Sequence, residues 1–425
     1  MNRKDFIKNT ALSLAGITIV PRAVLGGANY IAPSDRINLG YIGTGKQVPT
    51  LLNGLGQLPE TMVVAASDVD KQKLAHFINL ANNTNLKKNK HNVDGYSDYR
   101  ELLSRKDIDA IVVASPDHWH ALHVIDSAKV GKDIYCEKPL ALTIDEGRAI
   151  VNAVKKHKRV LQTGSMQRSQ HNFRHAAELI RNGYIGNVHT VNVSVGEPIK
   201  QCDLPSLPTP EYLDWDMWVG PSLYRGYHPI LSPPLESNEW AWWRGYRDFG
   251  GGYITDWGAH MFDIVQWALD MDNSGPVEFV PPSTPAATSG LYYKYSNGTQ
   301  VNHRQWGEPN AIQFIGDEGT IEVSRSFLRF SNPKLNDIKL SNKDNRLHYS
   351  DNHYADWIKS IKDRSTPVAS VEIGHRTATV CNAVNIAYET QKKLKWNPKT
   401  ELFDNPYANN MKSRPYRGHW DYNNY

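Results

Sequence analysis

A buried strand that runs directly into a glycine-rich turn constrains the fold of this chain more than any other feature. Residues 37–42 are apolar enough for a central strand, and Gly43-Thr44-Gly45 follows at once. The glycines permit a tight turn and let backbone N–H groups approach a pyrophosphate at the start of the next helix. Val48 stands at the third glycine of the G-x-G-x-x-G pattern, where its β-branched side chain should hold the helix slightly off the strand. The turn predicts a nucleotide-binding unit if strands and helices alternate after it.

A second predicted strand, residues 62–68, ends in an acid. Asp68 stands 23 residues after Gly45, near the position where a carboxylate accepts hydrogen bonds from an adenosine ribose. No arginine follows Asp68 directly, so the sequence favours NAD over NADP as the cofactor. The alternative is that Asp68 caps the helix that starts near Lys71.

Strands and helices go on alternating to about residue 163. This pattern predicts a doubly wound parallel sheet of six strands, in which ligands sit beyond the carboxyl ends of the strands. The later strands are predicted at residues 110–114, 133–137 and 160–163. Two polar segments follow strand ends and should face one crevice, namely Ser115-Pro116-Asp117-His118-Trp119-His120 and Glu137-Lys138-Pro139. We expect His118 and His120 to line the nicotinamide side, although His120 could instead begin a helix and donate to backbone.

The second half of the chain has a different texture. Hairpin signals surround Ser296-Asn297-Gly298 and residues 316–319, which predicts an antiparallel sheet and an α+β domain. Helices expected at residues 353–362 and 373–393 should pack on the first domain or on a partner chain. The predicted divisions are an export signal or disordered N-terminus (1–30), a Rossmann domain (35–164), a substrate and oligomerisation domain (165–395) and a surface-wrapping arm (396–425).

A triple glycine precedes the residues most suited to acid–base chemistry. Gly250-Gly251-Gly252 gives a loop that can approach a ligand, and Thr255 could cap the next helix. Asp256 and His260 are four apart, so on a helix the carboxylate can orient the imidazole; the alternative is an ordinary surface pair. Oxidation of an alcohol needs a base, a positive group for the developing alkoxide and a hydride acceptor. We assign His260 as the base, Lys138 as the positive group and Asp256 as the orienting residue, while a lysine at a strand end can also simply face solvent.

Two aromatic segments, residues 215–227 and 240–244, have two interpretations. Their tryptophans and tyrosines could supply stacking faces for a sugar ring, and a plain aromatic core explains them nearly as well.

Composition and the N-terminus bound the remaining functions. The formal net charge is +4, of which the first 25 residues carry +3, so the rest of the chain gives no reason to expect nucleic acid or an anionic membrane as partner. The three cysteines, Cys136, Cys202 and Cys381, have neither disulfide-framework nor metal spacing, and no metal site is expected. A basic start, an apolar run from Ala11 to Val20 and Pro21 indicate an export signal that is too short for a stable membrane anchor. Its Arg3-Lys4 pair resembles a twin-arginine signal with the second arginine replaced; the expected location is periplasmic or otherwise exported, or cytoplasmic if the segment is not a working signal.

The motifs together resemble the Gfo/Idh/MocA family of nicotinamide-dependent sugar and inositol dehydrogenases, and in particular its secreted bacterial branch. The matching pieces occur in the family's order and approximate spacing: Gly43-Thr44-Gly45, Asp68, residues 115–120, Glu137-Lys138-Pro139 and residues 256–260. The resemblance implies a Rossmann domain, a C-terminal domain with a large open sheet often used for dimerisation, and a catalytic set matching Lys138, Asp256 and His260. It also implies that Glu137 and Lys138 lie against the nicotinamide, often beside a cis peptide before the proline.

The resulting expectations are specific. The predicted cofactor is NAD, and the predicted contacts to it come from the glycine turn, the acid after the second strand and the two strand-end segments: Gly43, Thr44, Gly45, Asp68, Ser115, Pro116, His118, His120 and Glu137. The predicted substrate is a small carbohydrate, bound by Lys138, Arg168, Asp256 and His260, and the expected assembly is a homodimer or homotetramer. The leading hypothesis is an NAD-dependent dehydrogenase of a secondary hydroxyl; the alternatives are a glycosidase that oxidises transiently with NAD, and a non-catalytic nucleotide-binding protein. The glycosidase branch of the family typically lacks the lysine that Lys138 matches, which favours the dehydrogenase.

Overall fold

The computed structural model describes residue 31 and residues 35–86, 92–341 and 343–422. The predicted export signal, residues 1–30, lies outside these described residues.

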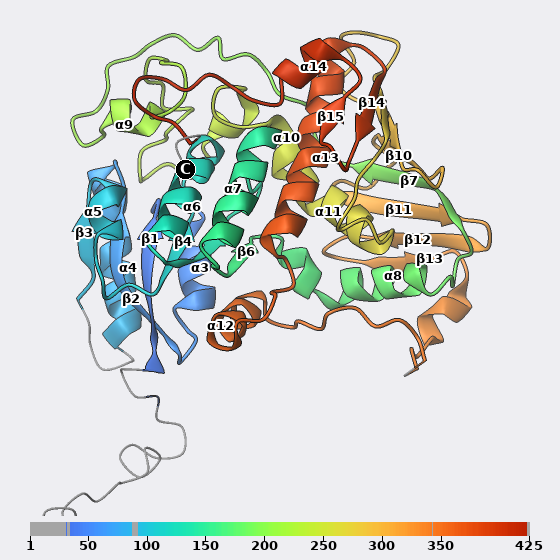
Figure 1. Ribbon diagram of the computed structural model, residues 1–425, viewed down its shortest axis with the longest axis horizontal. Helices are drawn as coiled ribbons and strands as arrows, with labels where there is room; N and C mark the ends of the chain where they lie inside the picture. The colour runs from blue at the N-terminus through green and yellow to red at the C-terminus, as the bar shows by residue number, and fades with distance from the viewer. Residues whose placement is uncertain (1–30, 32–34, 87–91, 342, 423–425) are drawn as a thin grey trace, which may run out of the picture.

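The first domain is built on a parallel sheet of six strands with the order β3-β2-β1-β4-β5-β6 (Figure 1). The strands are β1 (Ile37–Ile42), β2 (Thr61–Ser67), β3 (Asp94–Tyr96), β4 (Ala110–Val113), β5 (Asp133–Cys136) and β6 (Leu161–Thr163). The predicted doubly wound Rossmann domain is confirmed. The three-residue β3, exposed at the sheet edge, was not among the predicted ranges because it is too short and polar to show an apolar run.

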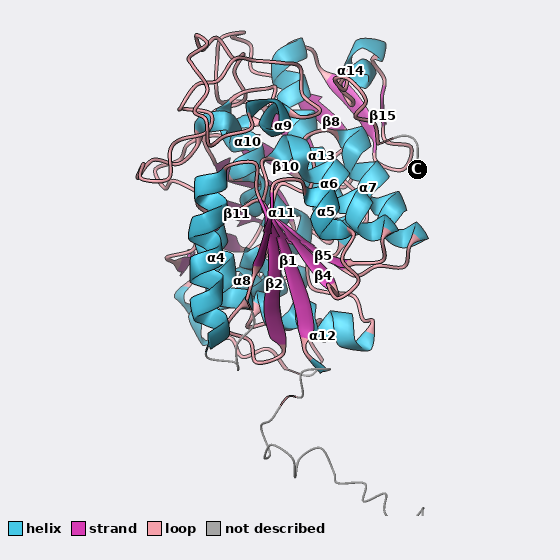
Figure 2. Ribbon diagram, turned by 90° about the vertical axis from the view of Figure 1, so that its left-hand side faces the viewer, coloured by secondary structure: helices cyan, strands magenta, loops and turns pink. Residues whose placement is uncertain are grey.

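Helices cover both faces of this sheet because successive strand residues point to opposite sides. Figure 2 shows α4 on one face and α5, α6 and α7 on the other. The bounds are α3 (Val48–Leu55), α4 (Lys71–Leu86), α5 (Tyr99–Leu103), α6 (His120–Lys129), α7 (Ile144–Lys156) and α12 (His353–Asp363), with a 3-10 turn η2 (Asp117–Trp119) before α6. Leu39 and Tyr41 of β1 pack with α3, α4 and α12, whereas Ile42 faces α5 and α6. Val48 is fully buried in the core that β1 forms with α3, α4 and α12. The start of α3 therefore accommodates a side chain bulkier than glycine.

The second domain contains a sheet of nine strands with the order β13-β12-β11-β7-β10-β9-β8-β14-β15. The strands are β7 (Val188–Ser194), β8 (Glu278–Val280), β9 (Tyr292–Lys294), β10 (Gln300–His303), β11 (Ala311–Gly316), β12 (Gly319–Val323), β13 (Leu328–Phe330), β14 (Leu394–Asn397) and β15 (Leu402–Phe403). Among these strands the neighbours pair antiparallel, except that β10 pairs parallel with β7. The predicted large, mainly antiparallel sheet and both predicted hairpins are confirmed.

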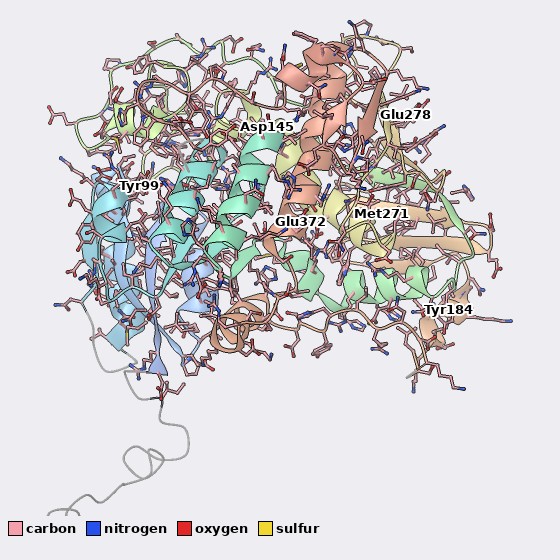
Figure 3. The ribbon with its side chains drawn as sticks, in the orientation of Figure 1. Tyr99, Asp145, Tyr184, Met271, Glu278 and Glu372 are labelled. Atoms are coloured by element: carbon pink, nitrogen blue, oxygen red, sulfur yellow. The ribbon has the colours of Figure 1, made fainter. Side chains whose placement is uncertain are left out.

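The second domain also contains helices, of which α11 and α13 lie between the two sheets (Figure 1). The bounds are α8 (His171–Arg181), α10 (Gly252–Asp256), α11 (Gly258–Ala268), α13 (Val371–Thr390) and α14 (Pro406–Asn410), with 3-10 turns η3 (Met166–Ser169) and η5 (Pro333–Asp337). Every residue of α11 is buried, so this helix is the centre of the second core. Helix α13 packs on α7 of the first domain as well as on α11, as predicted for the late helices. Glu372, labelled in Figure 3, lies where α13 meets α7 and pairs with Arg148 at 3.0 Å.

A long loop segment, residues 196–250, leaves the nine-stranded sheet after β7, contacts the first domain and leads into α10. It holds the short helices α9 (Trp215–Val219) and η4 (Trp242–Gly245) and its own small aromatic core. This core includes Trp215, Trp218 and Trp243. Backbone hydrogen bonds fix the segment to the start of α4, since Lys71 N donates to Tyr212 O at 2.9 Å. We call residues 230–244 of this segment the strap.

The predicted boundary between residues 395 and 396 is wrong. It would cut β14, which pairs with both β8 and β15, so the sheet continues past residue 396. The alternation of Leu394 and Trp396 as buried residues is too short a pattern to show a strand in the sequence. The wrapping arm begins after α14, and its path back over the first domain is visible in Figure 1. There Arg414 and Tyr416 both donate to Glu146 of α7, at 2.8 and 2.6 Å.

None of the described helices is both long enough and apolar enough to cross a membrane.

Candidate functional site

The glycine turn after β1 is built as the sequence predicted. Gly43 has a φ of +86°, and a Cβ there would lie 2.6 Å from the backbone nitrogen of Ser115. Gly45 has open space where a Cβ would stand, with no atom within 4 Å. The first glycine therefore lets two strand ends meet closely, and the last leaves room beside the N-terminus of α3 for a ligand.

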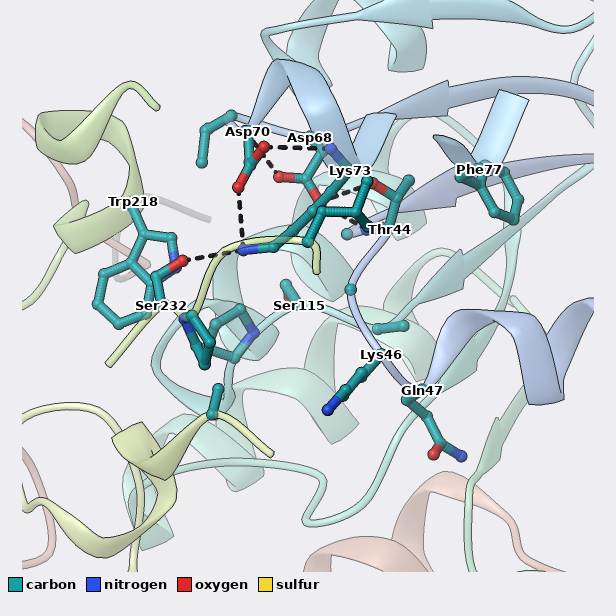
Figure 4. A pocket seen from close by; sticks show the side chains of 18 of the residues that line it. Thr44, Lys46, Gln47, Asp68, Asp70, Lys73, Phe77, Ser115, Trp218 and Ser232 are labelled. Carbon is teal, nitrogen blue, oxygen red and sulfur yellow. Dashed lines mark hydrogen bonds and ion pairs between the residues drawn. The ribbon is translucent and has the colours of Figure 1, made fainter. Parts of the chain in front are cut away.

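Asp68, at the end of β2, is tied to this turn. Its carboxylate accepts from Thr44 N at 2.6 Å and from Thr44 Oγ1 at 2.8 Å. Burial raises the pKa of Asp68, although these hydrogen bonds oppose the shift. Figure 4 shows Asp68 beside Thr44 at the rim of the cleft.

The capping role considered for Asp68 belongs to Asp70. Asp70 Oδ1 accepts from the backbone nitrogens of Gln72 and Lys73 at 3.0 and 3.1 Å, in the first turn of α4. Asp68 keeps its carboxylate at the cleft, so the helix-cap interpretation of Asp68 is wrong.

A cleft runs along the carboxyl ends of β1, β2 and β4, and the strap forms its other wall. Gly43, Thr44, Gly45, Asp68, Ser115 and Pro116 all line it, as predicted for cofactor contacts. Two lysines of the first domain reach across it: Lys46 Nζ donates to Glu239 O at 2.7 Å, and Lys73 Nζ donates to Ser232 Oγ at 3.1 Å (Figure 4). The strap therefore covers the cleft and is held to the first domain by these two lysines.

The aromatic segments form a core, which is one of the two interpretations of their sequence, and some of their residues also line the cleft. Trp218 and Trp243 are buried in the aromatic core and also contribute to the wall of the cleft. Trp240 of the strap lines the same cleft and is 54% exposed, and the guanidinium carbon of Arg244 lies 5.4 Å from the centre of its ring.

His118 and His120 do not line this cleft, contrary to the prediction. Both are 1% exposed. His118 Nε2 lies 2.9 Å from Trp218 O, and the two ring nitrogens of His120 lie 2.8 and 2.9 Å from Pro139 O and Ser115 O. Burial lowers the pKa of His120 to about 4 and that of His118 to about 3, so both are neutral near pH 7. His120 contacts the backbone of both strand-end segments, which is the backbone alternative considered for it, and His118 contacts the backbone of α9.

Glu137 also lies behind the cleft wall and not on it. Its carboxylate accepts from Gln47 Nε2 at 3.4 Å, and Gln47 does line the cleft. The Lys138–Pro139 peptide bond that follows is cis.

Lys138 and Asp256 form an ion pair that joins the two domains. Lys138 Nζ donates to Asp256 Oδ1 and, at 3.1 Å, to Asp256 O. Both side chains are 18% exposed, so small molecules can still reach them. Burial opposes ionisation of Asp256, but the charges of Lys138 and Arg244 outweigh it and lower its pKa. Arg244 Nε lies 3.6 Å from the same carboxylate oxygen, and Arg244 also lines the cleft.

His260 lies near this pair, but Asp256 does not orient it. Helix α10 ends at Asp256 and α11 starts at Gly258, and the carboxylate is committed to Lys138. Among the described residues no partner is found for His260 Nδ1. Burial, and then the charge of Lys138, lowers the pKa of His260 well below its usual value. The histidine is therefore an uncharged group whose buried Nδ1 has no hydrogen-bond partner among the described residues. Thr255, predicted to cap a helix, lies inside α10 and donates to Gly252 O at 3.3 Å.

Arg168 is not available to a substrate. Its side chain is 1% exposed and makes two hydrogen bonds to each of two carboxylates, those of Asp263 and Asp272. Isolated in the sequence, an arginine after a strand end resembles an anion ligand; the two acids that occupy it lie about a hundred residues later and only the fold brings them together.

The sequence reasoning missed several residues of the site. Trp119, His123, Lys46, Gln47 and Lys73 line the cleft. Trp119 and His123 stand one and three residues from His120, a predicted contact, so their position was foreseeable. The lysines carry no pattern that separates them from surface lysines.

The residues of the cleft fit a dinucleotide cofactor. An open glycine turn at a helix N-terminus suits a pyrophosphate, and a carboxylate at the end of the second strand suits a ribose diol. Asp68 has hydrogen-bond acceptor capacity beyond its contacts to Thr44 and to Asp70 N.

Comparisons with known proteins agree with this geometry. Residues 37–165 match the Gfo/Idh/MocA model described as an oxidoreductase family NAD-binding Rossmann fold, and residues 181–422 match the model described as an oxidoreductase family C-terminal alpha/beta domain. Together they take in nearly all of the described chain.

The relatives extend over different parts of the chain. Myo-inositol 2-dehydrogenase of Thermotoga maritima is 23% identical over 84% of this chain and 98% of that protein. A glycosyl hydrolase family 109 protein of Shewanella pealeana is 29% identical, but over only 37% of each chain. Among solved structures, the WlbA dehydrogenase of Bordetella pertussis in complex with NADH and UDP-GlcNAcA superimposes with a TM-score of 0.60 at 17% identity, covering 85% of this chain and 98% of that one.

Two observations support one assignment. The family matches span both domains, and the glycine turn lies at the cleft together with Asp68. The chain belongs to the Gfo/Idh/MocA family of oxidoreductases and carries the family's NAD-binding Rossmann domain.

Proposed function

We propose that this protein is an NAD-dependent oxidoreductase that oxidises, or in reverse forms, a secondary hydroxyl of a sugar, glycoside or cyclitol. The observation that carries the proposal is the Lys138–Asp256 ion pair, which stands at the end of β5 beside the neutral His260. This arrangement brings together a cation from the first domain with a carboxylate and an uncharged base from the second domain. The full-length likeness to an inositol dehydrogenase supports the same substrate class.

Each of the three residues has a distinct proposed role. His260 is uncharged, so its imidazole can take the hydroxyl proton of the substrate. Lys138 places an ammonium group where an alkoxide develops, and Asp256 holds that ammonium in position through two hydrogen bonds. When bound, the NAD supplies the hydride acceptor.

A mixture of the purified full chain, NAD and a panel of sugars tests this proposal. We expect the near-ultraviolet absorbance of reduced nicotinamide to rise with at least one sugar, glycoside or cyclitol. A panel in which no compound changes that absorbance, although NAD binds, would remove the dehydrogenase assignment.

The likeness to a glycosyl hydrolase family 109 protein favours one second candidate. A glycosidase of this kind oxidises its substrate transiently, eliminates the aglycone and reduces the product again. That likeness is confined to about a third of the chain, and the family resemblance associates the lysine at position 138 with dehydrogenases. Release of the aglycone from an aryl glycoside without accumulation of reduced nicotinamide would favour the glycosidase.

A further inference from the structure

Arg325 is a cation of the nine-stranded domain that stands close to the proposed catalytic residues Asp256 and His260. It follows β12, and its side chain is exposed. Its guanidinium carbon lies 4.7 Å from the centre of the Trp257 ring. Trp257 separates α10 from α11, between Asp256 and His260, so the ring holds the guanidinium beside both residues.

A buried glutamine links the same arginine to His260. With the Gln167 amide oriented to satisfy both of its ends, Oε1 accepts from Arg325 Nε at 3.0 Å and Nε2 donates to His260 O at 3.3 Å. Gln167 is 1% exposed, so this link is rigid. It uses Nε and leaves the outer edge of the guanidinium, with its two terminal nitrogens, without an ion-pair partner among the described residues.

Around Arg325, the positive charges of the site outnumber the carboxylates that could balance them. Asp256 is committed to Lys138 and also lies 3.6 Å from Arg244. The two other acids nearby are Asp117 and Glu137; burial raises the pKa of Asp117 well above its usual value and also raises the pKa of Glu137, so ionisation of both is disfavoured. Arg325 is close enough that its charge lowers the pKa of His260 after the effects of burial and Lys138.

We propose that Arg325 binds a carboxylate of the substrate, so that the substrate class is a sugar acid, such as a uronic acid or a glycoside that contains one. A planar guanidinium edge held over an indole ring matches a planar carboxylate in a bidentate pair. This inference rests on the proposed function, because it names the substrate of the same site. The inference assigns the specificity for a sugar carboxylate to Arg325 of the second domain, whereas Lys138 belongs to the first domain.

Matched sugar pairs test the inference with the full chain and NAD. The probes are methyl β-D-glucuronoside against methyl β-D-glucoside, and the corresponding galacto pair, because each pair differs only at C6. We expect kcat/KM to be about tenfold or more higher for the uronosides, since hydrogen bonds to charged groups are the strong ones. Arg325→Ala should lower the ratio of uronoside to glucoside kcat/KM by a similar factor, mainly through KM, and Arg325→Lys should restore part of it.

A matched control and a phosphate arm sharpen the test. Arg329→Ala removes a nearby arginine that is 53% exposed and already paired with Glu308, and it should leave the ratio unchanged. Glucose 6-phosphate separates carboxylate recognition from anion binding in general. A preference for the phosphate over both uronosides would overturn the carboxylate assignment.

The failure of this inference differs from the failure of the proposed function. Equal kcat/KM for uronosides and glucosides, or a ratio that Arg325→Ala does not change, overturns the inference and leaves the dehydrogenase standing. If no sugar reduces NAD, the proposed function fails, and quenching of tryptophan fluorescence by the uronosides then decides the inference alone. Quenching that Arg325→Ala abolishes supports it, and absence of quenching in the unaltered protein overturns it.

Discussion

Lys138 Nζ donates to both the carboxylate and the backbone carbonyl of Asp256, and so ties the end of β5 to the end of α10. One of these residues comes from each domain. A cation in this position is fixed in two directions, which suits a group that must meet a developing charge at one point.

Asp68 should control both the affinity for NAD and the discrimination against NADP. Asp68→Ala removes an acceptor for the ribose and an anion that would repel a 2′-phosphate. We expect weaker NAD binding by about tenfold, and a smaller preference for NAD over NADP, in a fluorescence titration with the reduced cofactors. Asp98→Ala is the control, because Asp98 caps α5 through Arg100 N but does not line the cleft. Equal affinity for NAD in the Asp68 variant would contradict the assigned contact.

Arg168 should matter for stability and not for substrate affinity. Arg168→Ala leaves the fully buried Asp263 without its counter-ion, which typically costs about 3–5 kcal/mol of the free energy of unfolding. Denaturant unfolding measures this loss. Arg329→Ala, at an exposed pair, should cost no more than about 1 kcal/mol. A folded Arg168 variant of normal stability and raised KM would return Arg168 to the substrate-binding set.

Several buried histidines should make the fold sensitive to mild acid. Burial lowers the pKa of His120 and of His353 to about 4, whereas an unfolded histidine has a pKa of 6.5. The unfolded chain therefore binds more protons below pH 6.5, so this stability is complete above pH 6.5 and is lost as the pH falls toward about 4. The denaturation midpoint should fall steadily over that range. A midpoint that is constant from pH 7 to pH 5 would show that these rings are not buried neutral.

Protonation of His260 should determine how kcat falls at acid pH, which we call the acid limb. His260 must be neutral to accept a proton, and burial with the charge of Lys138 keeps its pKa well below 6.5. In steady-state assays kcat should therefore stay nearly constant from pH 8 to pH 6.5 and decline only at lower pH. His260→Gln should abolish this limb together with most of the activity. If the residual activity of that variant still falls at acid pH in the same way, a group other than His260 is responsible for the fall.

Much of the fold could be predicted from the sequence because its signals are local. The apolar run of β1 followed by Gly43 specifies a strand, a turn and a helix within a few residues, and the turns at residues 296–298 and 316–319 specify hairpins. The order of the nine strands and the position of β14 could not be predicted, since they depend on pairings between residues far apart in the chain. Leu394, for example, pairs with Phe279.

The site was predictable to the extent that its residues stand at strand ends. Asp68 and Ser115 line the cleft for that reason, and Lys138 reaches Asp256 across the domain boundary. The helical spacing of Asp256 and His260 was misleading because the helix is interrupted between them and because Lys138 takes the carboxylate. Arg325 carried no signal, since only the packing of the nine-stranded domain brings it to Trp257.

The most direct test of the central claim compares NAD reduction in the unaltered protein with that in Lys138→Ala and His260→Ala. Each variant is mixed with NAD and a sugar that the unaltered protein oxidises, and kcat and the affinity for NAD are measured separately. Lys359→Ala is the control, because its exposed side chain pairs with Asp363 four residues on. The account predicts that both site variants bind NAD nearly as well as the unaltered protein and lose about a hundredfold or more in kcat. Unchanged kcat in both variants would contradict it.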